Sequence, residues 1–277
     1  MEDFLNNTSQ NESYGQSEID QDYDYDKYKS LNFIKRVATF VIISICLPLT
    51  MAAIYSVFFM VRNDRGAPFY VINILISDVI QLSCLTVWGA LQIWEYISSF
   101  IYRMAVLASV GFMVCLALER YLVIAKPLWY RFNRSKNMSV VVCAVVWASS
   151  IVFNFSYKTT CVAFLLPFPL LIFFLVGTVR ALSTSISVPS DEKRRIVGIL
   201  VLVLLIYTLL FLPFLITILK SKLISYTLFI VSDIFLRCSP LANLVLYVFI
   251  RKGTIDKLLA AVGCCRKESN DPQSVSM

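Results

Sequence analysis

Seven long apolar stretches divide the chain, and they constrain its fold more than any other feature of the sequence. A helix that crosses a membrane needs roughly 17–25 mostly apolar residues. Stretches of this length or more, separated by short polar breaks, lie at residues 37–61, 68–92, 97–125, 138–156, 160–182, 196–219 and 224–250. The sequence therefore predicts an all-α membrane protein with a seven-transmembrane helix bundle over residues 34–250.

Composition places the chain in the same class. Apolar residues make up 58% of the chain and charged residues 16%, whereas soluble domains average about 45–50% and about 25%. Mean hydropathy is +0.73. Because the sequence has no histidine, no cysteine cluster at metal-ligand spacing and no glycine-rich phosphate loop, we expect it not to be an enzyme. The basic residues lie in short loops between apolar spans, which indicates membrane orientation and no nucleic-acid partner.

The net charge of +7 is unevenly distributed along the chain. Residues 1–30 hold eight acids and two lysines, a net of −6, so the remainder carries +13. With the N-terminus outside, the inner segments hold 15 Lys and Arg and the outer segments hold seven. Cytoplasmic loops carry the excess of Lys and Arg in membrane proteins, which predicts an outer N-terminus and an odd number of crossings. We therefore expect a multi-pass protein of the plasma membrane with an extracellular N-terminus.

The segments that flank the bundle differ in character. Residues 1–33 are predicted to be a disordered acidic extracellular tail. The amphipathic pattern of residues 251–262 predicts a short helix lying in the membrane interface, followed by a cytoplasmic tail over residues 263–277. Cys264 and Cys265 follow that helix, so they are a candidate palmitoylation pair.

The predicted outer segments contain candidate modification sites. Sequons, which mark possible glycan sites, begin at four asparagines on this side: Asn6, Asn7, Asn11 and Asn154. The tail also interleaves acids with tyrosines in a pattern that resembles tyrosine-sulfation sites on peptide-binding receptors: Tyr23, Tyr25 and Tyr28. Such a segment would attract basic partners. The alternative is a solvated acidic tail without modification.

A charged triplet, Glu119-Arg120-Tyr121, stands at the predicted cytoplasmic end of the third span. An arginine at a membrane boundary is costly unless it is paired, and Glu119 can hold Arg120 until a partner competes. The triplet, followed by Lys126-Pro127-Leu128, resembles the signature of rhodopsin-like (class A) G-protein-coupled receptors. Standing alone, such a triplet is more typical of an ordinary interfacial ion pair.

Asp78 lies in the middle of the second span, where a carboxylate indicates function because an intramembrane charge is expensive. Its position resembles that of the family's second-helix Asp, which binds a sodium ion in the bundle core. The resemblance implies that oxygen donors would come from Ser109, Ser239 and Asn243. Hard cations take oxygen ligands, so the residue types suit a sodium site. We expect no other cofactor.

Three further elements follow in the family's order. Trp147 resembles the fourth-helix Trp, and Phe211 with Pro213 resembles the sixth-helix kink with its aromatic switch residue. Asn243 and Tyr247 resemble the seventh-helix N-P-x-x-Y element. Taken singly, Trp147 and Phe211 are more typical of core packing. Together with the earlier motifs they extend the resemblance over residues 37–262, with the nucleotide, lipid and peptide receptors as the nearest branch.

The sequence also departs from the family pattern. Thr50 stands in place of the first-helix Asn, and Gly177 in place of a fifth-helix Tyr that helps to hold the active state. Leu244 replaces the Pro of the seventh-helix motif, so that kink is predicted to be weaker or absent. Glu95 occupies the position of the third-helix Cys, which leaves Cys161 without its family partner. The chain could be a divergent receptor or a truncated form that lacks outer-loop residues.

Three charged residues in the outer halves of spans are ligand candidates: Arg103, Asp233 and Arg237. Asp233 and Arg237 are spaced i and i+4, so they share a helix face and could simply neutralise each other. Arg103 has no partner in its own span, and a guanidinium inside a bundle suits a carboxylate or phosphate. The ligand class stays open among acidic small molecules, lipids and peptides.

These motifs predict a receptor that transmits an extracellular ligand signal to a heterotrimeric G protein. The residues expected to couple the two sides are Glu119, Arg120, Tyr121, Phe211, Pro213, Asn243 and Tyr247. One alternative is a protein of the receptor fold with impaired or no signalling, which four departures motivate: Thr50, Leu244, Gly177 and Glu95. A transporter is the third alternative, and it would need a polar pathway that the few intramembrane charges do not trace.

Overall fold

The computed structural model describes the backbone of residues 2–62, 69–90, 95–126, 128, 130, 132, 136–184, 190–219 and 226–250. Side chains are described within these ranges from residue 26 onward, apart from short stretches at several helix ends. The predicted interfacial helix at 251–262, the tail at 263–277 and the candidate palmitoylation sites Cys264 and Cys265 lie outside the described residues. So do the side chains of Asn6, Asn7, Asn11, Tyr23 and Tyr25.

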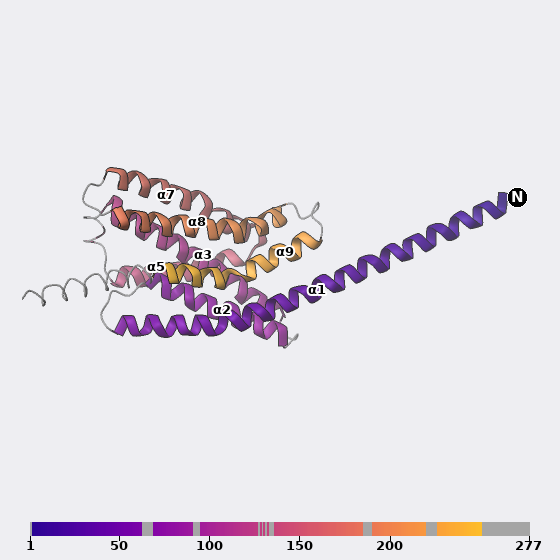
Figure 1. The fold of residues 1–277 in the computed structure, drawn as a ribbon, viewed down its shortest axis with the longest axis horizontal. Coiled ribbons are helices and arrows are strands. Elements are labelled where there is room, and N and C mark those ends of the chain that lie inside the picture. Colours follow the sequence, from indigo (N-terminus) through magenta and orange to yellow (C-terminus); the bar gives the residue numbers. More distant parts are fainter. Residues whose placement is uncertain are drawn as a thin grey trace, which may run out of the picture.

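The described chain is a bundle of helices packed side by side (Figure 1). The labelled helices are α1 (Glu2–Arg62), α2 (Phe69–Ala90), α3 (Glu95–Ala125), α5 (Lys136–Asn154), α6 (Tyr157–Leu165), α7 (Pro167–Thr184), α8 (Ser190–Leu219) and α9 (Tyr226–Arg237). Residues 239–250 continue helical beyond α9.

Seven helical stretches among the described residues are long and apolar enough to cross a membrane, which confirms the predicted seven-span bundle. They run over Asp26–Phe59, Phe69–Trp88, Tyr96–Ala125, Asn137–Asn154, Lys158–Ser183, Lys193–Thr217 and Tyr226–Ile250.

Helix α3 is the centre of the bundle and contacts α2, α5, α6, α7 and α8. Its buried side chains are small or apolar, and Ala105, Ala108, Phe112 and Met113 are all fully buried. Many large apolar side chains on the other helices are exposed, as a surface that faces lipid requires. The arrangement places both ends of α3, and therefore Arg103 and Arg120, at the junctions of several helices.

Helix α1 differs from the expectation for the N-terminal tail. Its backbone is helical from Glu2 onward, without a break before the first membrane span, and its first half projects away from the bundle (Figure 1). The described turn at Tyr28 and Asn32 is regular, with Asn32 Nδ2 donating to the Tyr28 carbonyl over 3.0 Å. Because helix formation is cooperative, an extension of the first span by several turns adds one backbone hydrogen bond per residue.

The connection between the fourth and fifth spans consists of two residues, Phe155 and Ser156, between α5 and α6. The Thr160 hydroxyl donates to the carbonyls of Phe153 and Ser156, at 2.9 and 3.0 Å, which closes the turn. The predicted short loop is therefore confirmed. At Leu166 the fifth span turns into α7, which begins at Pro167, a residue suited to a first helical position.

The seventh span is interrupted at Cys238. Pro240 has no backbone N–H to donate to the carbonyl of Leu236, so the ladder of helical hydrogen bonds is interrupted there. The ladder resumes at Ala242, whose N–H donates to the Cys238 carbonyl over 3.2 Å. Leu244 stands where the family has a proline, which predicts a weaker kink at this position. Residues 239–250 are helical through Leu244. The helix is interrupted at Pro240 instead, a position that the family motifs did not predict.

Candidate functional site

A cavity of about 660 Å³ lies at the end of the bundle where α3 begins, which we call the pocket end. Six helices and the connection between α5 and α6 supply its lining: Trp88, Ser99, Tyr102, Arg103, Asn154, Phe155, Thr160, Phe214, Thr217, Tyr226, Phe229, Asp233 and Leu236. Aromatic rings dominate this lining, and Arg103 and Asp233 are its charged members. The cavity falls in the size range of small-molecule sites in proteins.

Arg103 reaches across the pocket end to the fourth span. Its Nη1 donates to Ser99 Oγ over 2.9 Å and its Nε donates to Asn154 Oδ1 over 3.2 Å. The expectation that Arg103 has no partner in its own span is therefore wrong, because Ser99 lies one turn before it on α3. Both partners are neutral side chains.

Asn154, a candidate glycosylation site, is buried with 6% of its surface exposed. Its Nδ2, the atom that a glycan would modify, donates to the Phe100 carbonyl over 2.8 Å. This geometry disfavours a glycan at Asn154, because attachment would require the side chain to leave its contacts with α3.

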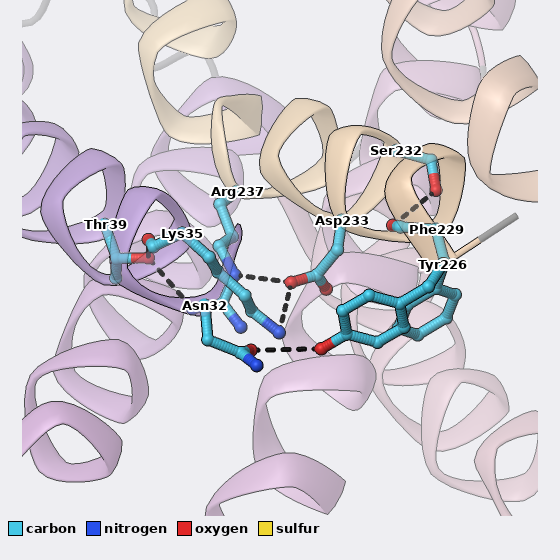
Figure 2. Close-up of polar contacts among 8 residues, drawn as sticks. All are labelled: Asn32, Lys35, Thr39, Tyr226, Phe229, Ser232, Asp233 and Arg237. Atoms are coloured by element: carbon cyan, nitrogen blue, oxygen red, sulfur yellow. Dashed lines mark hydrogen bonds and ion pairs between the residues drawn. The ribbon is translucent and has the colours of Figure 1, made fainter. Parts of the chain in front are cut away.

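Asp233 joins two cations from different helices (Figure 2). Its Oδ2 lies 2.9 Å from Arg237 Nε and 2.9 Å from Lys35 Nζ. Arg237 also donates from Nη1 to Thr39 Oγ1 over 3.2 Å, and its guanidinium lies 4.8 Å from the ring centroid of Trp88. The i, i+4 pairing expected of Asp233 and Arg237 is present, whereas the third charge, Lys35 of α1, was not predicted.

The start of the seventh span is held against α1 by two contacts of Tyr226. Its hydroxyl donates to Asn32 Oδ1 over 3.1 Å (Figure 2). Its ring stacks on Tyr28 with 4.7 Å between centroids. Tyr28, a sulfation candidate, is 51% exposed, and its ring forms part of the α1 surface that contacts Tyr226.

Asp78 is fully buried in the middle of the bundle, where Asn243 Nδ2 donates to its Oδ1 over 2.6 Å and to Ser109 Oγ over 3.0 Å. Ser239 lies beside them and donates to Gln81 Oε1 over 2.8 Å. The structure thus brings together three predicted sodium ligands, Asp78, Ser109 and Asn243, and places Ser239 on Gln81.

Two oxygens of this buried polar cluster, Asp78 Oδ2 and Asn243 Oδ1, have no hydrogen-bond partner in the part of the chain that the structure describes. Buried polar atoms are normally satisfied by protein, water or an ion. A carboxyl oxygen and an amide oxygen that stay open within one hydrogen-bonded cluster form a donor set that suits a small hard cation. The residues present therefore fit the sodium ion that the family resemblance implies.

At the opposite end of α3, Glu119 does not pair with Arg120, contrary to expectation. Its Oε1 accepts a hydrogen bond of 2.6 Å from the hydroxyl of Tyr130, in the segment after α3. The Arg120 Nε is buried and has no hydrogen-bond partner among the described residues. Consecutive helical residues point about 100° apart, so side chains at i and i+1 do not face each other. We call this region the Arg120 end.

Gly177 explains where the neighbouring Tyr121 side chain lies. A Cβ built on Gly177 would stand 2.6 Å from Tyr121 Cε2, so the ring occupies the space that any other residue would fill. Phe173 and Phe174 flank the same ring, with centroids 5.9 and 5.8 Å away. The glycine that replaces the family's fifth-helix Tyr therefore leaves a space on α7, and the Tyr121 ring fills it.

Replacing Gly177 by Ala should lower the thermal stability of the protein, because the flanked Tyr121 ring must move. Overpacking of this kind costs about 1–3 kcal/mol, against a gain of about 1 kcal/mol in helix propensity. Gly198→Ala is the matched control, since nothing lies within 4 Å of its added Cβ. Thermal unfolding of both variants in detergent checks the prediction, which an equal or higher melting temperature for Gly177→Ala would contradict.

Trp147 combines packing with one polar contact. Its Nε1 donates to Asn73 Oδ1 over 3.1 Å, and its ring meets Phe112 edge-on at 5.9 Å. Asn73, whose Nδ2 also donates to Cys143 Sγ, links α2 to α5 and was not singled out from the sequence.

Phe211 of α8 is fully buried and stacks on Tyr207 and Phe164, with centroids 4.9 and 5.6 Å away. The hydroxyl of Tyr207 donates to the Phe164 carbonyl. This aromatic cluster lies between α6 and α8, and its Phe211 is two residues before Pro213, which sits inside α8. Phe211 is thus a core residue that touches the helix break in the fifth span.

Tyr247 is buried near the end of the seventh span. Cys161 has no disulfide partner among the described residues, and the side chain of Glu95 lies outside them. Thr50 is fully buried, and its hydroxyl has no partner.

Comparison with known proteins matches residues 51–158 to the model of the "7 transmembrane receptor (rhodopsin family)". Mas-related G-protein coupled receptor member D of Rattus norvegicus is 28% identical over 114 residues, which are 36% of this chain and 35% of that protein. G-protein coupled receptor 65 of Homo sapiens is 24% identical over 146 residues, 49% of this chain and 42% of that protein.

Type-1 angiotensin II receptor of Meriones unguiculatus is 27% identical over 101 residues, which are 33% of this chain and 28% of that protein. The chain thus matches less than half of the length of each of these relatives. The matched family segment runs from the first span to the start of the fifth, so it includes Asp78, Glu119-Arg120-Tyr121 and Trp147.

Proposed function

We propose that this chain, a member of the rhodopsin family of seven-transmembrane receptors, transmits the binding of an extracellular ligand to a heterotrimeric G protein at the plasma membrane. One observation carries the proposal: α3 joins a ligand-sized cavity at Arg103 to a buried, unpartnered Arg120 Nε at its other end. The two residues are 17 positions apart, or roughly 25 Å along a helix. The excess of Lys and Arg at the Arg120 end supports a cytoplasmic location for it.

Activation would proceed by a ligand-shifted equilibrium between two packings of the bundle. Pro213 interrupts the hydrogen-bond ladder of α8, so α8 can pivot there at low cost. At the Arg120 end, Arg195 of α8 donates from Nη2 to the Ile250 carbonyl over 2.9 Å. Outward movement of α8 would break this contact and expose Arg120.

The partner surface at the Arg120 end would combine cations with exposed apolar side chains. Leu128 and Phe132, which follow α3, are 74% and 86% exposed. Arg194 is exposed at the start of α8. An amphipathic helix of a G protein would bury the two apolar side chains and place its carboxylates on the cations.

The buried polar cluster would hold a sodium ion through the open oxygens of Asp78 and Asn243, with Ser109 and Ser239 within the same cluster. The bound cation supplies positive charge that neutralises the buried carboxylate. It would stabilise the packing in which the second, third and seventh spans lie together around Asp78.

Nucleotide exchange tests the receptor proposal. The full chain, fused to a G-protein α-subunit and shown to reach the cell surface, should raise the rate of GTP uptake above that of the unfused subunit. Arg120→Ala should return the rate to the background, because the G protein loses its contact at the end of α3. Lys158→Ala, which removes an exposed cation of α6, is the charge-matched control and should leave the rate unchanged.

The alternative, a receptor-fold protein that does not signal, predicts the opposite result. If nucleotide exchange stays at the background in both the parent chain and Arg120→Ala, and both proteins are at the cell surface, the signalling proposal is wrong.

A further inference from the structure

The charged side chains around the cavity are predominantly positive. Arg103 and Asp233 line the cavity, and Asp233 is paired with Lys35 and Arg237. Among these described residues, three cations face one carboxylate, which leaves a net charge of +2. The side chains of Asp233 and Arg237 are only 15% and 5% exposed, so water screens them less than charges on an open surface, whereas Arg103 is exposed at the edge of the cavity.

Asp233 is poorly suited to recognising a cationic ligand. Both Lys35 Nζ and Arg237 Nε lie 2.9 Å from its Oδ2, and its side chain is only 15% exposed. A ligand amine would have to compete with two fixed cations for one carboxylate. The like charges of Lys35 and Arg237 would also repel it, at a cost that falls with distance according to Coulomb's law.

Arg103 differs from the cations near Asp233, because its hydrogen-bond partners are neutral. Ser99 Oγ and Asn154 Oδ1 accept from Nη1 and Nε, and these contacts fix the plane of the guanidinium at the edge of the cavity. A guanidinium presents five N–H donors in a rigid fork that matches carboxylates and phosphates. Its Nη2 has no partner among the residues that the structure describes, so these N–H donors are available for an anion.

The other walls of the cavity favour a ligand with an apolar body. Trp88, Phe155, Phe214 and Phe229 contribute aromatic surface from α2, the α5–α6 connection, α8 and α9. Such walls bind flat or extended apolar groups through area burial and ring stacking. With only two residues between α5 and α6, no hairpin of that connection lies across this volume.

We propose that the ligand of this cavity is a small amphipathic anion, with an apolar or aromatic body on the four rings and a carboxylate or phosphate on Arg103. The inference rests on the proposed receptor function, since it names the ligand class of the same site. It resolves the choice between acidic and basic ligands that the sequence alone leaves open, in favour of the acid.

Three probes with one body test the charge preference directly. The full chain in phosphatidylcholine nanodiscs is titrated with 1-naphthaleneacetate, the neutral 1-naphthaleneacetamide and the cationic 1-naphthaleneethylamine, by ligand-observed NMR. The acetate should bind at least about tenfold more tightly than either other probe, as a charge-assisted contact implies. Arg103→Gln should remove this advantage and leave amide binding unchanged. Amine binding that equals or exceeds acetate binding overturns the proposal, as does an acid preference that survives in Arg103→Gln.

Thiol modification keeps the proposal testable if none of the naphthalene probes binds. In a Cys161→Ser background, Phe229→Cys places a thiol on the cavity wall, and Tyr96→Cys places one on the exposed start of α3. The rate ratio of an anionic to a cationic methanethiosulfonate should be about fivefold higher at position 229 than at position 96. Arg103→Gln or Lys35→Met should reduce it. An equal or lower ratio at position 229 overturns the proposal.

The anion can come from the aqueous phase or from the membrane, and the lipid composition distinguishes these sources. If acetate binding weakens in nanodiscs that also contain phosphatidylglycerol, a membrane anion competes for the site; unchanged binding assigns the site to a soluble acid. None of these measurements involves a G protein. Acid-selective binding without nucleotide exchange would therefore support the anion site while it contradicts the signalling proposal.

Discussion

Asp233→Asn should destabilise the bundle by about 3 kcal/mol, because it leaves Arg237 as a buried cation without a counter-charge. The Arg237 side chain is only 5% exposed, and Thr39 Oγ1 and the Trp88 ring are the neutral contacts that remain to it. Asparagine keeps the shape of the side chain, so the loss reports charge and not a cavity. Unfolding in mixed micelles, followed by tryptophan fluorescence, measures the change in free energy.

Two variants serve as controls for the Asp233 prediction. Lys35→Met should cost about 1 kcal/mol or less, because the Lys35 side chain is 22% exposed and the Asp233–Arg237 pair stays neutral without it. Asp233→Asn combined with Arg237→Met should recover most of the loss, since it removes the uncompensated charge. Equal costs for Asp233→Asn and Lys35→Met would show that burial of Arg237 is not the cause.

The Lys35 contact shows where sequence reasoning stops. The spacing of Asp233 and Arg237 predicts their pairing, because i and i+4 share a helix face wherever the helix lies. Lys35 is 198 residues from Asp233 and meets it only because α1 packs against α9 at a particular rotation. No local pattern encodes that rotation, so the sequence identifies the pair and misses the triad.

The same limit separates the two ends of α3. The membrane spans, and the positions of Asp78 and Asn243 near mid-depth, follow from length and hydropathy, and the structure brings these two side chains to 2.6 Å. The partner of Glu119 does not follow, because Tyr130 lies 11 residues along the chain, beyond the end of α3. Adjacent residues in a helix diverge, which could have warned against a Glu119–Arg120 pair.

Gly177 illustrates a departure from a family pattern that is informative once its neighbours are known. Viewed in the sequence, it is the loss of a tyrosine that helps to hold an active state. In the structure, its missing side chain admits the Tyr121 ring beside Phe173 and Phe174. The space beside Gly177 on α7 is filled by the Tyr121 side chain of α3. Such compensation in side-chain volume between two helices is visible only when both packing surfaces are known.

Sodium should raise the melting temperature of the full chain, and Asp78→Asn should abolish the effect. A ligand at ten times its dissociation constant stabilises the folded state by about 1.4 kcal/mol. In the parent chain, the open oxygens of Asp78 and Asn243 would take that cation. Thermal unfolding in nanodiscs is compared in sodium chloride and in N-methylglucamine chloride at equal ionic strength, so that screening is constant.

Asp78→Asn should also change stability in the absence of sodium, and in the opposite direction. Asp78 is fully buried, and Asn243 Nδ2 is the one donor to it among the described residues, so an ionised carboxylate at this position is under-compensated without a cation. Replacing a buried charge by a neutral group of the same shape is neutral or stabilising. The variant should therefore melt at or above the parent in N-methylglucamine and lose that advantage in sodium. A sodium shift that persists in Asp78→Asn would place the ion elsewhere in the bundle.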